Sequence, residues 1–244
     1  MNEPFLSVVI PAYNEALRLE RSLACIREYL AGKQLSAEVI VVDDGSTDGT
    51  PALLANAVIE WPQIRLFCNE LNRGKGYSVR RGALEARGTY VLFTDADLSA
   101  PIQETDKLLD ALESSGAEAA IGSRALNRKL TGVRQPAIRE WSGRLFNVLV
   151  RAATGLPIHD TQCGFKLFRR EATRRSFELQ RTSGFGFDPE VLFLIRRSGG
   201  RILEIPVRWN NDRATKVRLL IDPVRMFWDL AALRWRAWTG AYPR

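Results

Sequence analysis

The chain has 244 residues, 45% of them hydrophobic and 26% charged. These are ordinary values for a globular protein, and they exclude disordered, collagen-like and low-complexity classes. The three cysteines, Cys25, Cys68 and Cys163, lie far apart with no CxxC pair, which argues against a disulfide framework or structural zinc and for a reducing compartment. With a single histidine, His159, the chemistry is expected to use carboxylates, Lys, Arg, hydroxyls or an oxygen-bound metal.

Charge is unevenly distributed along the chain. Residues 1–122 hold 11 Lys+Arg against 18 Asp+Glu, whereas residues 123–244 hold 24 against 10. The basic half is expected to face an anion, and the charge leaves a phosphate, a membrane surface and a nucleic acid open. No segment has the pattern of a signal peptide, and no window of about 18 residues is free of charge, so we expect no membrane-spanning helix.

The first half alternates short apolar strands with amphipathic helices. Strands are expected at residues 6–10, 39–42, 64–67, 90–93 and 119–121, and helices at residues 15–30, after residue 48, at residues 76–86 and at residues 101–114. Pro11 is expected to end the first strand, and Asp48 to cap the second helix. The alternation predicts an α/β fold with a largely parallel sheet and helices on both faces.

The alternation stops after the fifth strand. A basic loop over residues 124–136 and an apolar helix over residues 138–154 are expected to follow, then a mixed α+β region and a final amphipathic helix over residues 223–238. No linker and no internal repeat interrupts the chain. We therefore expect one compact domain with two lobes, residues 1–122 and residues 123–244.

Asp95 and Asp97 directly follow the fourth strand. Ligands of open α/β sheets sit at the carboxyl ends of the strands. Two carboxylates spaced i, i+2 can bind one hard cation, Mg²⁺ or Mn²⁺, that also bridges phosphates. Such pairs also serve as caps and turns, but the position at the end of a parallel strand favours a metal.

The other strand ends carry polar side chains that complete the same crevice. Asp43 and Asp44 end the second strand, where a carboxylate can accept from a base N–H or a ribose hydroxyl, and residues 11–15 close the first. Residues 72–76, Asn-Arg-Gly-Lys-Gly, open a helix whose N–H groups and two cations suit a phosphate. This segment is neither a Walker A loop nor a GxGxxG loop, which argues against an ATPase and a dinucleotide-binding protein.

In their order and intervals these motifs resemble the family 2 inverting glycosyltransferases, which have the GT-A fold. The segments that carry the resemblance are residues 9–15, 42–48, 72–76 and 95–97. The second half resembles the polyprenyl-phosphate glycosyltransferases. The segments that carry this resemblance are residues 122–124, 160–168, 187–192 and 204–207. The tail from Asp229 to Tyr242 is similar to that of the dolichyl-phosphate β-glucosyltransferases. The QxxRW motif of processive polysaccharide synthases is missing, and we expect no N-terminal membrane helix of the kind found in the eukaryotic enzymes.

The resemblance implies a fold and an activity. The fold is a GT-A mixed sheet in which residues 1–122 bind a nucleotide sugar and residues 123–244 form a C-terminal lobe that binds the acceptor and faces a membrane. The activity is transfer of glucose from UDP-glucose to a dolichyl-type polyprenyl monophosphate, with inversion. A GDP-mannose donor or a non-lipid acceptor is the alternative, and a basic nucleic-acid-binding module is the alternative of another class. The protein is expected in the cytoplasm, peripherally associated with the cytoplasmic face of a membrane.

The resemblance also implies roles for single residues. The nucleoside is expected to be held by Pro11, Tyr13, Glu15 and Asp44. The diphosphate is approached by Lys75, and the metal and the catalytic role fall to Asp95 and Asp97. Arg124 is expected near the phosphates, and Arg139 near the acceptor phosphate. Arg213 and Lys216 are expected in a flexible basic loop that closes over both substrates. An ordinary solvated charge is the alternative for Arg124, Arg213 and Lys216.

An acceptor phosphate is already anionic near neutral pH, so transfer needs cations to hold it more than a general base. If a base is needed, Asp188 and Glu190 are the candidates, and support of the acceptor lobe is their alternative role. His159 is expected in a loop, and Cys163 is expected to serve packing.

The final helix is expected to lie in a membrane interface, because arginines flank a stripe of large apolar side chains. The stripe consists of Val224, Phe227, Trp228, Ala231, Trp235 and Trp238. The helix over residues 138–154 is expected to add a second such surface with Trp141, Leu145, Phe146 and Leu149. Packing of both stripes against the sheet is the alternative.

Overall fold

The computed structural model describes residues 3–127, 130, 137–210 and 222–243. For residues 137–145, 222 and 223 the description covers the backbone alone. The basic loop expected over residues 124–136 therefore lies in large part outside the described residues.

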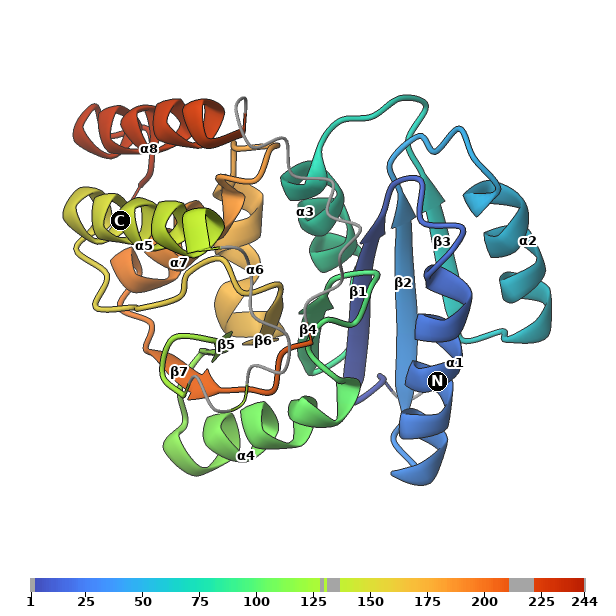
Figure 1. Cartoon of the computed structure of the whole chain (residues 1–244). Helices are drawn as coiled ribbons and strands as arrows, with labels where there is room; N and C mark the ends of the chain where they lie inside the picture. Colours follow the sequence, from blue (N-terminus) through green and yellow to red (C-terminus); the bar gives the residue numbers. More distant parts are fainter. Residues whose placement is uncertain (1–2, 128–129, 131–136, 211–221, 244) are drawn as a thin grey trace.

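A seven-stranded sheet forms the centre of the described part of the chain (Figure 1). Its strands are β1 (Leu6–Ala12), β2 (Ala37–Asp43), β3 (Ile64–Cys68), β4 (Tyr90–Thr94), β5 (Ala119–Ser123), β6 (Phe165–Arg169) and β7 (Ile202–Pro206). They are arranged in the order β3-β2-β1-β4-β6-β5-β7. Every neighbouring pair is parallel except the two pairs of β6, which runs antiparallel to both β4 and β5. The largely parallel sheet is thus confirmed, with one reversed strand inside it.

Helices cover both faces of this sheet, as predicted (Figure 1). They are α1 (Leu19–Gly32), α2 (Thr50–Glu60), α3 (Lys75–Glu85), the short 3₁₀ helix η1 (Ile102–Glu104), α4 (Thr105–Ser115), α5 (Ala137–Thr154), α6 (Arg170–Leu179), α7 (Phe187–Arg197) and α8 (Asp222–Trp238). Helices α5 and α8 lie side by side, at the end of the molecule away from α1 and α2 (Figure 1).

Alternation of side chains along the strands builds two hydrophobic cores. Val8 and Ile10 of β1 point to one face, where α1, α2 and α4 pack, and Val9 points to the other, where α3, α6 and α7 pack. Leu233 of α8 joins the second core. Each face of the sheet is therefore buried, which is why its strands read as continuous apolar runs.

Most element boundaries differ from the prediction by one or two residues, and the boundaries of β1 and α1 differ for a clear physical reason. β1 continues through Pro11 to Ala12 instead of ending at the proline. β4 pairs with β1 only as far as Val9, so one side of β1 is open there and a residue without an N–H is tolerated. α1 begins at Leu19 and not at residue 15, because Asn14, with a φ of 53°, lies in a loop whose N–H groups bind the segment after β2.

The start of α2 follows the prediction closely. Asp48 Oδ1 accepts a hydrogen bond from the N–H of Thr50, the first residue of the helix, at 2.9 Å, although the cap position itself is Gly49. Pro51 lies in the first turn, where its missing N–H has no cost.

Candidate active site

The predicted site residues whose side chains the structure describes gather at one edge of the sheet. β1, β2, β4 and β5 run in the same direction, so their carboxyl ends meet at that edge. The residues that follow these four strands include Tyr13, Asp44, Asp95 and Arg124, respectively. Lys75 joins them as the first residue of α3.

Lys75 and Asp95 form a close ion pair. Lys75 Nζ lies 2.6 Å from Asp95 Oδ1 and 5.3 Å from the centre of the Phe93 ring. Burial acts to lower the pKa of Lys75, but the carboxylates of Asp95 and Asp188 outweigh it and raise the pKa above its ordinary value. The lysine therefore stays positively charged beside the carboxylate pair.

Asp97 is partly buried beside Asp95. Its Oδ1 accepts the N–H of Ser99 at 2.9 Å, and Arg18 Nη1 lies 3.9 Å from its Oδ2. Burial, followed by the charge of Asp95, raises the pKa of Asp97. Two carboxylates that repel each other in this way favour a cation between them.

The residues present fit a divalent cation. Across the described ranges, no three His, Cys, Asp or Glu side chains come together as a metal cluster, so Asp95 and Asp97 stand as a pair. Carboxylate oxygens suit Mg²⁺ and Mn²⁺, which commonly take their remaining ligands from water and substrate phosphates.

Space around Asp95 is tight on the side of β6. A Cβ on Gly164 would lie 2.0 Å from Asp95 Oδ2, and the N–H of Asp95 donates to the carbonyl of Gly164 at 3.1 Å. Only glycine leaves room for the carboxylate at this position, so the glycine before β6 helps to fix Asp95.

Asp44, predicted to hold the nucleoside, organises the loop of residues 72–76, which is predicted to approach the diphosphate. It is 3% exposed. Its Oδ1 accepts from Asn69 Nδ2 at 2.7 Å and from the N–H of Arg73 at 3.0 Å, and its Oδ2 accepts from the N–H of Gly74 at 2.8 Å. The carboxylate thus sets the backbone that carries Lys75.

The segments after β1 and β2 are joined into one surface. The N–H of Asn14 donates to Ser46 Oγ at 2.8 Å, and Asn14 Oδ1 accepts the N–H of Thr47 at 2.8 Å. The carboxylate of Glu15 lies 2.6 Å from Arg18 Nη2. Tyr13 is 37% exposed on this surface, and Pro11 lies within β1 just before it.

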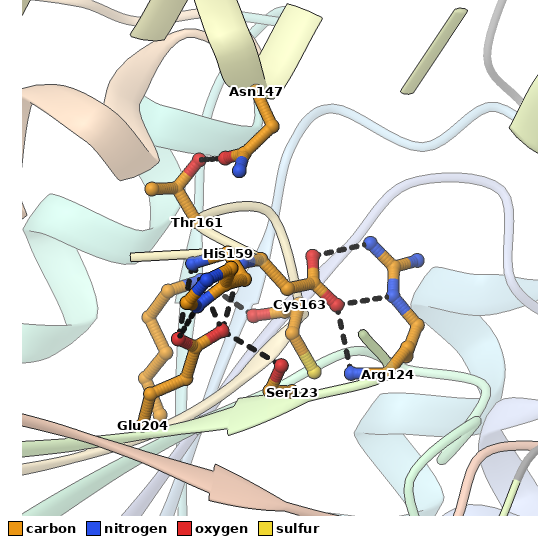
Figure 2. Close-up of polar contacts among 9 residues, drawn as sticks. Ser123, Arg124, Asn147, His159, Thr161, Cys163 and Glu204 are labelled. Carbon is orange, nitrogen blue, oxygen red and sulfur yellow. Dashed lines mark hydrogen bonds and ion pairs between the residues drawn. The ribbon is translucent and has the colours of Figure 1, made fainter. Parts of the chain in front are cut away.

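Arg124 is held in a fork by Asp160. The guanidinium Nε and Nη2 each lie 2.7 Å from a different carboxylate oxygen, and the Arg124 N–H donates to Oδ2 at 2.9 Å (Figure 2). Its guanidinium also lies 4.9 Å from the centre of the Trp209 ring. Although burial opposes it, Arg124 lowers the pKa of Asp160, so the carboxylate is held ionised.

Asp188 and Glu190, the predicted candidates for a base, differ in their surroundings. Lys166 Nζ lies 2.5 Å from Asp188 Oδ1 and both are buried; burial raises the pKa of Asp188 in spite of that partner. Glu190 is fully buried and accepts from the N–H of Thr182 at 2.7 Å and from the Tyr242 hydroxyl. Glu190 is therefore enclosed by protein donors, whereas Asp188 lies near enough to Lys75 to raise the pKa of that lysine.

The remaining predicted residues fall into two groups: some have no described side chain, and the others lie near the site. Arg213, Lys216 and the side chain of Arg139 lie outside the described residues. His159 lies in a loop, as expected. Cys163 is fully buried, as expected for packing, and burial is the main cause that raises its pKa to about 12.

Three residues of the site environment went unrecognised in the sequence: Lys166, Asn69 and Glu204. Lys166 and Glu204 stand alone as charged residues inside apolar strands, and that was the available signal. A buried charge requires a partner, and the partners here, Asp188 and the 159–160 turn, come from other elements.

Outside this edge, α8 exposes large apolar side chains. The exposed fractions are 57% for Val224, 50% for Phe227, 66% for Trp228, 62% for Trp235 and 78% for Trp238. The opposite side of the helix, with Met226, Leu230 and Leu233, is buried. The aromatic stripe of α8 therefore does not pack on the sheet.

No helix in the described ranges has the length and apolar character needed to cross a membrane.

The sequence was compared with known protein families. Residues 7–177 match the family described as Glycosyl transferase family 2. The chain belongs to glycosyl transferase family 2. It is therefore a glycosyltransferase, as the order of its motifs predicts.

Curated relatives extend the family match to nearly the whole chain. The dolichyl-phosphate beta-glucosyltransferase of Saccharomyces cerevisiae is 38% identical, with 98% of this chain and 77% of that protein covered. The dolichyl-phosphate beta-glucosyltransferase of Homo sapiens is 34% identical, with 97% of this chain and 77% of that protein covered.

Solved structures of other proteins share the fold. Glucosyl-3-phosphoglycerate synthase from Mycobacterium tuberculosis, in complex with Mn²⁺, uridine diphosphate and glucosyl-3-phosphoglycerate, superposes with a TM-score of 0.70 at 22% identity over 94% of this chain and 80% of that one. Mannosyl-3-phosphoglycerate synthase from Rubrobacter xylanophilus gives 0.70 at 19% identity, covering 99% and 76%. The expected GT-A fold is confirmed.

Proposed function

We propose that this family 2 enzyme transfers glucose from UDP-glucose to a dolichyl-type polyprenyl monophosphate, with inversion at the anomeric carbon. In this reaction an oxygen of the acceptor phosphate bonds to the anomeric carbon as the bond from that carbon to the diphosphate breaks, and UDP leaves. The observation that carries the proposal is the meeting, at one edge of the sheet, of the carboxylates of Asp95 and Asp97 with the cations Lys75 and Arg124. The names of relatives at 34–38% identity over nearly the whole chain support a glucosyl group and a dolichyl phosphate acceptor.

The donor is assigned to the half formed by residues 1–122. The Asn14–Ser46 contacts join the two loops that are predicted to hold the nucleoside. Lys75, positioned by Asp44 through the backbone of its loop, is assigned to the diphosphate. Asp95 and Asp97 would hold Mg²⁺ or Mn²⁺, and such an ion supplies charge that offsets the negative charge growing on the leaving diphosphate.

The acceptor is assigned to the half formed by residues 123–244, which carries the excess of basic residues. Arg124 is held by Asp160 in an orientation suited to a phosphate. A phosphate monoester is already anionic near neutral pH, so the residues of this half need to hold it in line more than to remove a proton. Asp188, paired with Lys166, fits a supporting role better than that of a base.

A membrane surface is proposed as the site of work. A polyprenyl tail stays in the bilayer, so the enzyme must reach its acceptor there. The exposed aromatic stripe of α8, with the exposed Val148 of neighbouring α5, suits an interfacial position. Three free cysteines, Cys25, Cys68 and Cys163, favour the reducing, cytoplasmic face.

A donor panel tests the proposal. The full chain is incubated with vesicles containing dolichyl phosphate, with Mn²⁺ or with EDTA, and with UDP-glucose or GDP-mannose. We expect a β-linked glucosyl phosphate lipid from UDP-glucose with Mn²⁺ and its loss with EDTA. Faster transfer from GDP-mannose would overturn the donor, and an α-linked product would overturn the single displacement. Binding of duplex DNA that neither UDP-glucose nor Mn²⁺ affects would favour the nucleic-acid alternative.

A further inference from the structure

We propose that Glu204 is a positioning residue that fixes Arg124 for a substrate phosphate by way of the turn at His159 and Asp160. Glu204 does not itself reach a substrate in this assignment. The inference rests on the proposed function, because it takes the phosphate role of Arg124 as given and asks what holds that arginine in place.

Glu204 is a charged residue in the middle of an apolar strand. It lies on β7, opposite Ile121 of β5 in the parallel pairing, and its side chain is 11% exposed. β5 ends at Ser123, and Arg124 follows directly. A carboxylate here costs free energy unless donors surround it, so its partners indicate its role.

Those donors come from two segments (Figure 2). Glu204 Oε1 accepts from Ser123 Oγ at 2.7 Å and from the N–H of Asp160 at 2.8 Å. Oε2 accepts from the N–H of His159 at 3.0 Å and lies 3.1 Å from His159 Nδ1. One carboxylate thus ties the end of β5 to the turn before β6.

The turn passes this constraint to Arg124. Glu204 accepts a hydrogen bond from the backbone N–H of Asp160. The carboxylate of Asp160 in turn accepts three hydrogen bonds from Arg124. Because the guanidinium is planar and its Nε and Nη2 face Asp160, its Nη1 edge points away from the carboxylate. The fork therefore determines the direction in which Arg124 presents its other donors.

The same turn is held from the opposite side by α5. Asn147 Nδ2 donates to the carbonyl of Ile158 at 3.1 Å. Figure 2 shows the second contact of this residue, in which Thr161 Oγ1 donates to Asn147 Oδ1 at 3.3 Å. Clamped between Asn147 and Glu204, the turn has little freedom, so Arg124 is ordered before a ligand arrives. Prior ordering lowers the entropy lost on binding and keeps the donors aimed at the charge they stabilise.

Affinity measurements on matched variants test the inference. Glu204→Gln keeps the side-chain shape but places an NH₂ group among donors, so we expect about a tenfold loss of affinity for the phosphate that Arg124 binds. Glu118→Gln is the control, because Glu118 Oε2 accepts the N–H of Arg201 at 2.5 Å and links the opposite ends of β5 and β7. We expect no affinity change in that control. Calorimetry with UDP and Mn²⁺, and the KM for a short-chain polyprenyl phosphate, separate a donor phosphate from the acceptor phosphate.

A double-mutant cycle separates positioning from general stability. If Glu204 acts through Arg124, Glu204→Gln causes no further loss in an Arg124→Met background. An equal loss with and without Arg124 would overturn the inference. If Glu204→Gln does not fold, Asn147→Ala loosens the same turn and takes its place in the cycle.

Arg124→Met also separates the phosphate role of Arg124 from the positioning role of Glu204. If that variant alone loses neither UDP nor polyprenyl phosphate affinity, the phosphate role of Arg124 in the proposed function is wrong. If Arg124→Met loses affinity and Glu204→Gln does not, the proposed function stands and the positioning role of Glu204 is overturned.

Discussion

At the scale of single residues, Lys75 already places a positive charge beside the carboxylates of Asp95 and Asp97. Its 2.6 Å contact with Asp95 neutralises one carboxylate, whereas Asp97, with its raised pKa, is left with more distant Arg18. A divalent cation would have to share Asp95 with Lys75. The two aspartates are therefore not equivalent, and Asp97 is the one with more to gain from a metal.

Asp97→Asn tests this directly. Asn keeps an oxygen that can accept the Ser99 N–H, so the turn after β4 should survive while one charge and one metal ligand are lost. We expect transfer to fall by about a hundredfold or more, together with weaker Mn²⁺-dependent UDP binding in calorimetry. Asp110→Asn, at an exposed position on α4, is the control. Near-native turnover of Asp97→Asn in the presence of EDTA would contradict the metal role.

Gly164→Ala tests the tight contact with Asp95. Because the new Cβ would lie 2.0 Å from Asp95 Oδ2, the carboxylate must move, and we expect a loss of turnover larger than any loss of stability. Gly32→Ala, at the end of α1, is the matched control, because nothing lies within 4 Å of the Cβ that this substitution adds. Steady-state rates and thermal melting of both variants provide the comparison; unchanged turnover of Gly164→Ala would show that Asp95 tolerates displacement.

Sequence patterns identified the charged groups of the site better than their partners. Asp95 and Lys75 were each predicted from a local motif, but their 2.6 Å contact joins two motifs. The contact of Lys166 with Asp188 also joins two segments that are distant in the sequence, and in that pair only Asp188 was predicted. Side chains that meet through tertiary packing have no fixed spacing in the sequence, and this is why such pairs escaped prediction.

At the scale of elements, α8 divides its side chains between two environments. The predicted stripe, including Trp228, Trp235 and Trp238, is exposed, while Leu233 on the opposite side enters the second core. Removing the whole helix would therefore damage that core as well as the surface. Point substitutions of exposed residues test the surface alone.

We expect Trp228→Ser, Trp235→Ser and Trp238→Ser, combined, to abolish cosedimentation with vesicles of phosphatidylcholine and phosphatidylserine at low salt. Aromatic side chains at an interface supply apolar burial, and each nearby basic residue adds about 1 kcal/mol on an anionic surface, so binding of the unchanged protein should also weaken with salt. Ile59→Ser is the control, because Ile59 is 79% exposed on α2. Failure of the unchanged protein to bind such vesicles, even with dolichyl phosphate present, would contradict the membrane role of α8.

The pKa of Asp229 on α8 leads us to expect that the stability of the protein depends on pH. Burial, followed by the charge of Glu190, raises the pKa of Asp229 in the folded protein. A carboxyl with a raised folded-state pKa costs stability as pH rises through that pKa, since the unfolded chain ionises more easily. Asp229→Asn removes this cost and keeps an acceptor for Gly186. We expect a higher melting temperature for the variant at pH 8, and a gain that shrinks towards pH 4; a variant less stable at pH 8 would contradict this.

The presence of a helix or strand was predictable from the sequence where the apolar pattern was long and regular. The residues at which these elements begin and end were not predictable in the same way. The start of α1 at Leu19 depends on Asn14 and its contacts with Ser46, which belong to another loop. The aromatic face of α8 was predicted because its spacing is local. Which of its two faces packs inward depends on α7 and α5, and sequence alone left that open.

At the scale of the whole molecule, the first five strands were predictable and the completion of the sheet was not. Strands β6 and β7 each contain a buried or nearly buried charge, Lys166 and Glu204, which weakens the apolar signal. The place of β6 between β4 and β5 depends on long-range pairing, for which no local pattern exists. The family resemblance supplied the mixed sheet that residue patterns could not.

That placement has a consequence for how the protein is made. A ribosome delivers β4 and β5 before β6, yet β6 is the strand that lies between them. Until residues 165–169 have emerged, the nascent chain holds an open strand edge at β4, and β5 has no neighbour in the sheet. Open apolar edges attract other chains. During translation from β5 through α5 the sheet therefore has an open edge at β4, and a stall there would release a chain whose β4 and β5 are not yet joined.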